Sequence, residues 1–582
     1  MERPAIQLIL DYKTFFGADP TNDRLSLVRH ICKRNLLVEI AGLNYRLKPN
    51  DTIFVDESFD RQRKELDWFT KNPDLYRYYS QIAARYTKSV DDYPNIFNRP
   101  ACLFALEEIS NSDIPEIEDF NFTKPEEWES ILKYLLAVNF HITQIKKEKD
   151  GVQASFEKVN PKLIRLNELR VKTDPLFTLY RGYRLITYFA RNPTYAKHLA
   201  EYFNKTYGMD YQFFLSSILH MYKAKVNAIP ENNFLFKLGR CQDSRFLDAL
   251  SKRHREENAL LLLGIRKSPF IKLAPREYIM GDNAFLLEKT YYQFINDFWF
   301  DCIKQILKPD GKNLISHQRY FADVGVFFEE YLREILTNSF KNYVASVLLT
   351  FDQLKLTGAQ GEFELCDIYF RADRKVIIGQ AKATGIYDEA KYGGDIGKLY
   401  KEDRAKFFKN FGVDQVVKSI KDLSANINRL DTTFPSTGEC EVYPCIVVND
   451  KALQTALMNH VFNLRFQELI TGFSDKNLKV HPLTLIHVMD LENVEEALSS
   501  NPQLIWNLLD NTIGHPAFLM PFYTSVYKLL PHISYPAKLL TAFTELFDKH
   551  NSQFKFSLTR ITNKLIDRIK GLPNLRKNGL AV

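Results

Sequence analysis

The sequence lacks the long apolar runs of a membrane protein. A helix that spans a bilayer needs about 20 consecutive apolar residues, whereas runs such as 259–263 end after a few positions. The start, Met1-Glu2-Arg3-Pro4, does not have the shape of a secretory signal peptide. The seven cysteines are odd in number and scattered, which favours reduced thiols over a disulfide framework. We therefore expect a cytoplasmic protein without a membrane anchor.

Several catalytic motifs are also missing. The chain has no G-x-x-x-x-G-K-[ST] loop, which argues against ATP hydrolysis. It has neither the G-x-S-x-G elbow of serine hydrolases nor the H-E-x-x-H helix of zinc proteases. Cys440 and Cys445 do not have the spacing or partners of a zinc site. If the protein is an enzyme, its chemistry rests on other residues.

The chain is long and rich in apolar residues. Its 582 residues are 45% hydrophobic and 13% aromatic, which is enough for several packed domains. The net charge of +7 is modest for this length, so it permits a nucleic-acid partner without requiring one. We expect a multidomain α+β protein.

The pattern along the chain divides it into four regions. We interpret 1–60 as a mixed segment with short strands at 36–40 and 52–55, and 61–310 as a mainly helical domain. Segments such as 128–136 in this domain show apolar residues three and four positions apart, the period of an amphipathic helix. A mixed α/β domain follows at 315–500, and a helical, basic region fills 501–582.

The end of the last region carries seven basic residues against one acidic residue, Asp567. A solvated helix surface and a phosphate-binding face are equally consistent with this pattern. The basic residues are Lys555, Arg560, Lys564, Arg568, Lys570, Arg576 and Lys577.

A hairpin at 364–382 is the most informative stretch of the sequence. Two β-type runs flank the polar segment 371–374, which predicts an antiparallel hairpin. With the turn centred between Ala372 and Asp373, Asp367 faces Ile378, and Gln380 and Lys382 follow on the same face. Diagonal neighbours on one face lie about 7–8 Å apart, so one divalent ion can bridge their oxygens.

The same alternation predicts that Glu364 points to the opposite face from Asp367. A half-buried surface strand pair with an ordinary aspartate and lysine is the alternative interpretation of this hairpin.

This arrangement resembles the PD-(D/E)xK nuclease superfamily, which has the restriction-endonuclease-like fold. The order of expected elements is similar over about residues 315–500. A helix at 325–332 and a strand at 343–351 precede the hairpin. A helix that begins at Gly412 and strands at 442–448 and 483–489 follow it. The resemblance implies an α/β nuclease core between helical N- and C-terminal regions.

The resemblance also implies a catalytic site made of Glu329, Asp367, Gln380 and Lys382. A Mg²⁺ or Mn²⁺ ion would be held by Asp367, by the amide oxygen of Gln380, by the backbone carbonyl of Ala381 and by Glu329. Gln380 stands where the family usually has an acidic residue, as in branches resembling Mrr-type restriction enzymes. A neutral amide oxygen is a weaker ligand for a hard cation than a carboxylate.

Further residues are implied in supporting roles. Glu330 is the alternative to Glu329, and Gln415 resembles an auxiliary glutamine that some family members place near the active site. A basic stretch after the hairpin fits either a solvated helix face or a surface that binds a nucleic-acid backbone. Its members are Lys398, Lys401, Arg404, Lys406 and Lys409.

These observations predict a metal-dependent nuclease, an endonuclease acting on DNA. By analogy at the level of the fold, it would be a restriction or anti-phage defence effector. Two alternatives stay open. Gln380 favours a catalytically degenerate protein that binds nucleic acid or acts as a scaffold, and the aromatic helical region allows a regulatory protein that binds a protein partner. DNA versus RNA, and a homo-oligomer versus a monomer, are not decided by the sequence.

Overall fold

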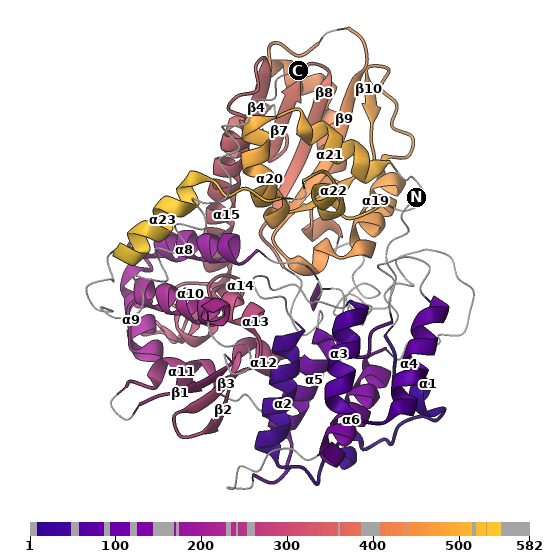
Figure 1. Ribbon diagram of the computed structural model, residues 1–582. Coiled ribbons are helices and arrows are strands. Elements are labelled where there is room, and N and C mark those ends of the chain that lie inside the picture. Colours follow the sequence, from indigo (N-terminus) through magenta and orange to yellow (C-terminus); the bar gives the residue numbers. More distant parts are fainter. Residues whose placement is uncertain are drawn as a thin grey trace, which may run out of the picture.

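The fold combines a large helical part with a six-stranded mixed sheet, as Figure 1 shows, so the predicted α+β class is confirmed. The computed structural model describes residues 9–47, 58–86, 94–116, 125–143, 168–169, 171, 174–227, 234–239, 242–252, 262–358, 361–385, 408–435, 437–514, 519–530 and 532–548. No helix within these ranges is both long and apolar enough to cross a bilayer.

Some predictions fall outside the described residues. These are the strand at 52–55, the basic residues Lys398, Lys401, Arg404 and Lys406, and the basic stretch after residue 548.

A first group of helices covers the N-terminal part of the chain. Their bounds are α1 Tyr12–Phe16, α2 Lys33–Arg46, α3 Phe59–Phe69, α4 Pro73–Tyr86, α5 Arg99–Asn111 and α6 Pro125–Thr143. The strand predicted at 36–40 is wrong, because these residues lie inside α2. Leu36, Leu37 and Ile40 are buried, and Leu43 and Leu47 continue the same helical spacing into the core. The segment 36–40 is too short to distinguish this period from a strand.

A second helical group follows, together with a small sheet that the sequence did not predict. Its helices are α8 Pro175–Arg191, α9 Ala196–Tyr207, α10 Tyr211–Asn227, α11 Arg245–Leu250, α12 Leu263–Lys267, α13 Asn283–Glu288 and α14 Tyr292–Asp301. The sheet is antiparallel in the order β1-β3-β2, with β1 Leu235–Lys237, β2 Phe270–Ala274 and β3 Glu277–Met280.

The main sheet lies in the C-terminal half. Its strands run in the order β10-β9-β8-β7-β4, and β11 also pairs with β9. Their bounds are β4 Ser346–Thr350, β7 Ile368–Ala372, β8 Lys375–Lys382, β9 Cys440–Val448, β10 Leu478–Val480 and β11 Thr484–His487. Strand β7 is antiparallel to β4 and to β8, and β9 is parallel to β8, β10 and β11. The strands predicted at 343–351, 442–448 and 483–489 are confirmed.

Helices cover both faces of this sheet. Ile368, Phe370 and Ile377 point into the large core that contains α15 (His317–Phe340), α20 (Val488–Ser500) and α21 (Leu504–Ile513). Tyr369 and Ile378 point the other way, into a core with α18 (Val413–Asn426) and α19 (Ala456–Ile470). Residues of even number on β8 therefore face α18, which places Gln380 and Lys382 on that side.

The register of the hairpin differs from the prediction. Its turn is Asp373-Arg374, with Asp373 at a φ of 51°, and Ile368 pairs with Gly379. Asp367 therefore lies beside Gln380, and the prediction that it faces Ile378 is wrong. The physical reason is Arg371, which the sequence placed in the turn. Its guanidinium is buried in the strand, where it forms an ion pair with Asp431.

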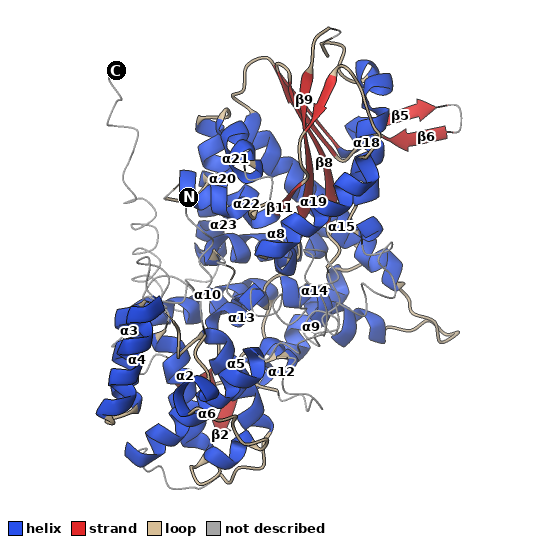
Figure 2. Ribbon diagram, turned by 90° about the vertical axis from the view of Figure 1, so that its right-hand side faces the viewer, coloured by secondary structure: helices blue, strands red, loops and turns tan. Residues whose placement is uncertain are grey.

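The segment before β7 is not one strand with it. Strand β6 (Gly361–Glu364) ends at Glu364, and it pairs with β5 (Lys355–Gly358) in a separate two-stranded ribbon. Figure 2 shows this ribbon apart from the main sheet. Residues 365–367 connect β6 to β7 and belong to neither strand.

The two halves of the chain share buried polar contacts. The guanidinium of Arg181 on α8 donates two hydrogen bonds of 2.9 Å to the carboxylate of Glu492 on α20. Tyr331 of α15 donates to the same carboxylate at 2.6 Å. The last helices, α22 (Phe522–Leu529) and α23 (Ala537–Asp548), follow α21, and α23 packs against α8.

Candidate active site

Asp367 is held in place by its own backbone and side chain. Its N–H donates to the carbonyl of Gly379 at 3.0 Å, and its carbonyl accepts from the N–H of Phe351 at 2.8 Å. The N–H of Ala381 donates to Asp367 Oδ2 at 2.7 Å. Burial raises the pKa of this carboxyl, against the opposing effects of Lys382 and the Ala381 amide. The carboxylate is thus fixed before any ligand arrives.

The amide of Gln380 faces this carboxylate. The side chain is buried, and one end of its amide lies 2.9 and 3.2 Å from the two oxygens of Asp367. With its nitrogen in that position the amide donates two hydrogen bonds to Asp367. With its oxygen there, two acceptors face each other, an arrangement that is favourable when a cation lies between them. The amide can therefore serve either as a donor or as a ligand.

Lys382 completes the polar end of the strand. Its Nζ lies 3.9 Å from Asp367 Oδ2 and 3.4 Å from Gln380 Oε1. The side chain is 17% exposed, so the ammonium group is largely sheltered from solvent. A sheltered cation stabilises negative charge more strongly than one in bulk water.

Helix α18 places Gln415 beside Lys382. Gly412 precedes the helix with a φ of +87°, and a Cβ built there would lie 2.7 Å from Lys382 Cε and 3.3 Å from Gln415 Oε1. The stem of Lys382 therefore runs along the backbone at Gly412, with Gln415 beside it. The helix predicted to begin at Gly412 is confirmed, as α18.

If the chain is the nuclease that the sequence predicts, replacing Gly412 with alanine is expected to reduce cleavage by more than about tenfold, because the new methyl group must displace Lys382. The left-handed backbone at this position adds a stability cost of about 1–3 kcal/mol. Gly472 is a matched control, since its φ is +84° and nothing lies within 4 Å of a Cβ there. Gly472→Ala should lower the melting temperature without changing the cleavage rate per folded molecule. Equal cleavage by both variants would contradict the contact with Lys382.

Glu329 and Glu330 differ in their surroundings, although they are neighbours on α15. Burial and the carboxylates of Asp367 and Asp352 raise the pKa of Glu329, while Arg333 and Lys382 oppose this rise. Glu330 instead lines a cavity against α8. Consecutive helix positions are about 100° apart around the axis, so both cannot face Asp367. The structure places Glu329 near the hairpin site and Glu330 away from it.

Glu364 is exposed at the end of β6, but its carboxylate is close enough to Asp367 and Glu329 to be affected by their charges, contrary to the prediction from strand alternation. Partial burial, and then the nearby carboxylates of Asp367 and Glu329, raise its pKa to about 7. The prediction was wrong because β6 stops at Glu364, so the alternation does not continue to Asp367. The signal in the sequence was the G-x-x-G turn at 358–361, which marks a separate hairpin.

Glu364→Gln is expected to stabilise the protein at pH 8 and to have little effect at pH 5. The raised pKa means that the folded chain keeps this proton up to about pH 7, whereas the unfolded chain loses it near pH 4.5. Ionisation therefore disfavours the folded state progressively between these values, and the penalty is complete above pH 7. Melting temperatures without divalent ions at both pH values measure the difference. Glu362→Gln, on the same strand, is the control, and an equal shift at both pH values would contradict the prediction.

The donors at this site suit a hard divalent cation. Asp367 offers a carboxylate and Gln380 an amide oxygen. The carbonyl of Ala381 shares the β7 side of the strand with its N–H, because both backbone groups of a strand residue point the same way. Mg²⁺ is typically bound through one or two carboxylates and keeps several waters. No group of three or more His, Cys, Asp or Glu side chains within the described ranges is close enough to hold a metal by itself, so such an ion would depend on the amide, the carbonyl and water.

Of the predicted basic residues, the structure describes Lys409. It is exposed and lies three positions before Gly412, whose N–H donates to its carbonyl at 3.0 Å. It thus lies at the entry to α18, the helix that carries Gln415.

Comparisons of the chain with families of known proteins, with characterised proteins and with solved structures return no match.

Proposed function

We propose that this protein is a metal-dependent nuclease that hydrolyses phosphodiester bonds, with DNA as its substrate. One observation carries the proposal. A buried amide, a fixed carboxylate and a sheltered lysine meet on one face at the end of a hairpin, with the Gln380 amide 2.9 Å from Asp367 and Lys382 Nζ 3.9 Å from it. A structural ion pair would not need a buried glutamine turned toward a carboxylate.

The order of elements supports placing this site in a PD-(D/E)xK core. Helix α15 carries Glu329, and β4, β7 and β8 follow as an antiparallel meander. Helix α18 then leads to β9, which pairs in parallel with β8. This is the sequence of elements that the resemblance implies, and it brings Glu329, Asp367, Gln380, Lys382 and Gln415 to one region.

The residues have separate tasks in this proposal. Asp367, Gln380, the Ala381 carbonyl and Glu329 would hold Mg²⁺ or Mn²⁺, which supplies Lewis acidity and lowers the pKa of bound water. Lys382 contacts the scissile phosphate and stabilises the negative charge that develops on its oxygens. Gln415 lies beside Lys382 and can orient either the lysine or the attacking water. The Ala381 N–H keeps Asp367 in position throughout.

The test is a cleavage assay of the pure protein on linear, circular and single-stranded DNA and on RNA. Each substrate is incubated with Mg²⁺, Mn²⁺ or EDTA, beside an Asp367→Ala, Lys382→Ala double variant. We expect cleavage of DNA by the wild type in either metal, none in EDTA and none by the double variant. Cleavage that persists in the double variant would refute the site.

Binding without cleavage would favour the alternative, a degenerate nucleic-acid-binding module. That alternative predicts salt-dependent binding, no cleavage in Mg²⁺ or Mn²⁺, and no divalent ion bound near Asp367. A role in restriction or anti-phage defence follows from analogy with the fold. Adding an extract of phage-infected cells to an inactive wild type tests for a trigger.

A further inference from the structure

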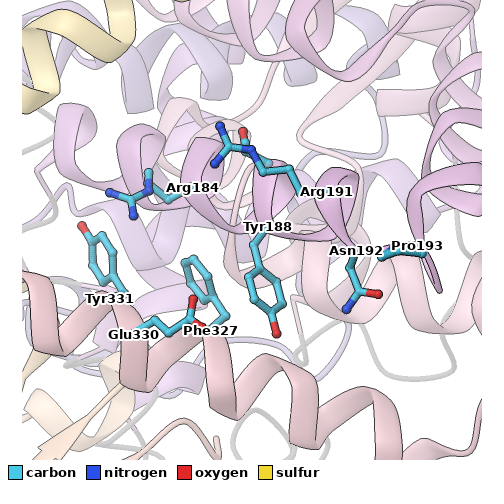
Figure 3. Close-up of a pocket in the computed structure, with 9 residues that line it drawn as sticks. Arg184, Tyr188, Arg191, Asn192, Pro193, Phe327, Glu330 and Tyr331 are labelled. Atoms are coloured by element: carbon cyan, nitrogen blue, oxygen red, sulfur yellow. The ribbon is translucent and has the colours of Figure 1, made fainter. Parts of the chain in front are cut away.

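A cavity of about 460 Å³ lies between α8 and α15, away from the hairpin site. Its volume falls within the range of about 300–1,000 Å³ that is typical of small-molecule sites. Figure 3 shows the side chains around it, which come from one face of each helix. The lining residues include Arg184, Tyr188, Arg191, Phe327, Glu330 and Tyr331.

The α8 side of the cavity combines positive charge with an aromatic ring. Arg184, Tyr188 and Arg191 are four and then three positions apart, so they lie along one stripe of the helix. Arg184 is held by an ion pair of 2.6 Å with Glu334. Arg191 is exposed and, within the described part of the chain, forms no ion pair. A ligand with one anionic group can therefore be bound at the Arg191 end.

The α15 side supplies apolar ring surface. The Phe327 ring lies 5.7 Å from that of Tyr188 and 5.8 Å from that of Tyr331, between centroids. Tyr331 is fixed because its hydroxyl donates to the buried Glu492. Phe327 and Tyr331 are buried, so they form a fixed floor that holds the half-buried ring of Tyr188, and a planar group can pack against that ring at a low cost in ordering.

Glu330 restricts which planar group fits. Its carboxylate accepts hydrogen bonds and repels a second anion. Burial, then Asp323 and Glu330, raise the pKa of Tyr188, so Glu330 acts on that ring. An amino-bearing nucleobase offers N–H donors at its edge, which suit a carboxylate. The cavity thus presents a cation at one point, an acceptor at another and ring surface in between.

We propose that this cavity binds a nucleoside monophosphate, with its base against Tyr188, its base edge toward Glu330 and its phosphate on Arg191. One phosphate matches Arg191, the lining arginine without an ion pair among the described residues, and the carboxylate of Glu330 disfavours a longer anionic chain. This binding site is independent of the proposed nuclease activity.

Isothermal titration calorimetry of the full chain in EDTA tests the proposal. The probes are AMP, GMP and CMP, with adenosine and inorganic phosphate as the separate halves of a nucleotide. We expect at least one nucleotide to bind with a Kd below about 1 mM, and each half to bind at least tenfold more weakly. Arg191→Glu and Tyr188→Leu should each weaken nucleotide binding at least tenfold.

Two controls locate the binding. Arg77→Glu changes an exposed arginine on α4 and should leave binding within twofold of the wild type. Lys382→Ala should do the same, because the hairpin site is separate. The proposal is overturned if no nucleotide binds below that limit, if both cavity variants bind like the wild type, or if Lys382→Ala is the variant that loses binding.

Discussion

Replacing Asp367 with asparagine is expected to lower the cleavage rate by about 1,000-fold or more. The change removes the charge of the fixed carboxylate that would hold the metal, and a loss of about 4 kcal/mol of transition-state stabilisation corresponds to three orders of magnitude. The asparagine oxygen can still accept from the Ala381 N–H, which donates to Asp367 at 2.7 Å. The fold should therefore be preserved, and since burial raises the pKa of Asp367, removing its charge should not lower stability.

The measurement is single-turnover cleavage in saturating Mg²⁺ and in Mn²⁺, with melting temperatures for each variant. Asp373→Asn is the matched control, because it makes the same substitution in the turn of the same hairpin. Asparagine tolerates the left-handed backbone found there, where φ is 51°. The control should cleave within about twofold of the wild type. An Asp367→Asn protein that keeps a tenth of the wild-type rate would show that the carboxylate is not the essential ligand.

Replacing Arg181 with methionine is expected to lower the free energy of unfolding by about 3–5 kcal/mol. Arg181 and Glu492 are 0% and 1% exposed, and the guanidinium donates two hydrogen bonds of 2.9 Å to the carboxylate. Removing the arginine leaves Glu492 charged and buried. Arg181 and Tyr331 both donate to this carboxylate, so the Tyr331 hydroxyl remains after the change. Urea unfolding, followed by circular dichroism, gives the change.

Three comparisons separate this effect from general damage. The loss should be smaller at pH 5 than at pH 8, because burial already raises the pKa of Glu492 and the variant lets it take up a proton. Arg181→Met combined with Glu492→Leu should recover most of the stability, since an apolar pair leaves no buried charge. Arg77→Met, which removes an exposed ion pair on α4, should change stability by less than about 0.5 kcal/mol. A double variant as unstable as the single one would contradict the account.

The core elements around the hairpin were predictable because their signals are local. Residues 442–448 of β9 are a continuous run of buried apolar residues, and the hairpin shows two β-type runs around a polar turn. Asp367, Gln380 and Lys382 were placed on one face correctly despite the wrong register, since the error was two residues and a strand has a period of two.

The features that were missed depend on distant partners. Arg371 reads as a turn residue because nothing nearby can pair with it in a strand. Its partner, Asp431, is sixty residues away. Glu364 was assigned to the wrong face because the chain leaves β6 and enters β7 within three residues, and alternation cannot be followed across such a break. The separation of Glu329 from Glu330 needed the position of α8, which no local pattern specifies.

The packing of α23 on α8 also has a consequence for synthesis. Tyr535, just before α23, donates a hydrogen bond of 2.7 Å to Asp174, the residue that caps α8, and Phe543 of α23 contacts the ring of Tyr180. Residues near the end of the chain thus complete a layer begun some 360 positions earlier. On the ribosome, Arg181 stays without Glu492 until 311 further residues have been made. A product that ends before Glu492 would leave the guanidinium of Arg181 buried without this partner and the α8 face uncovered by α23.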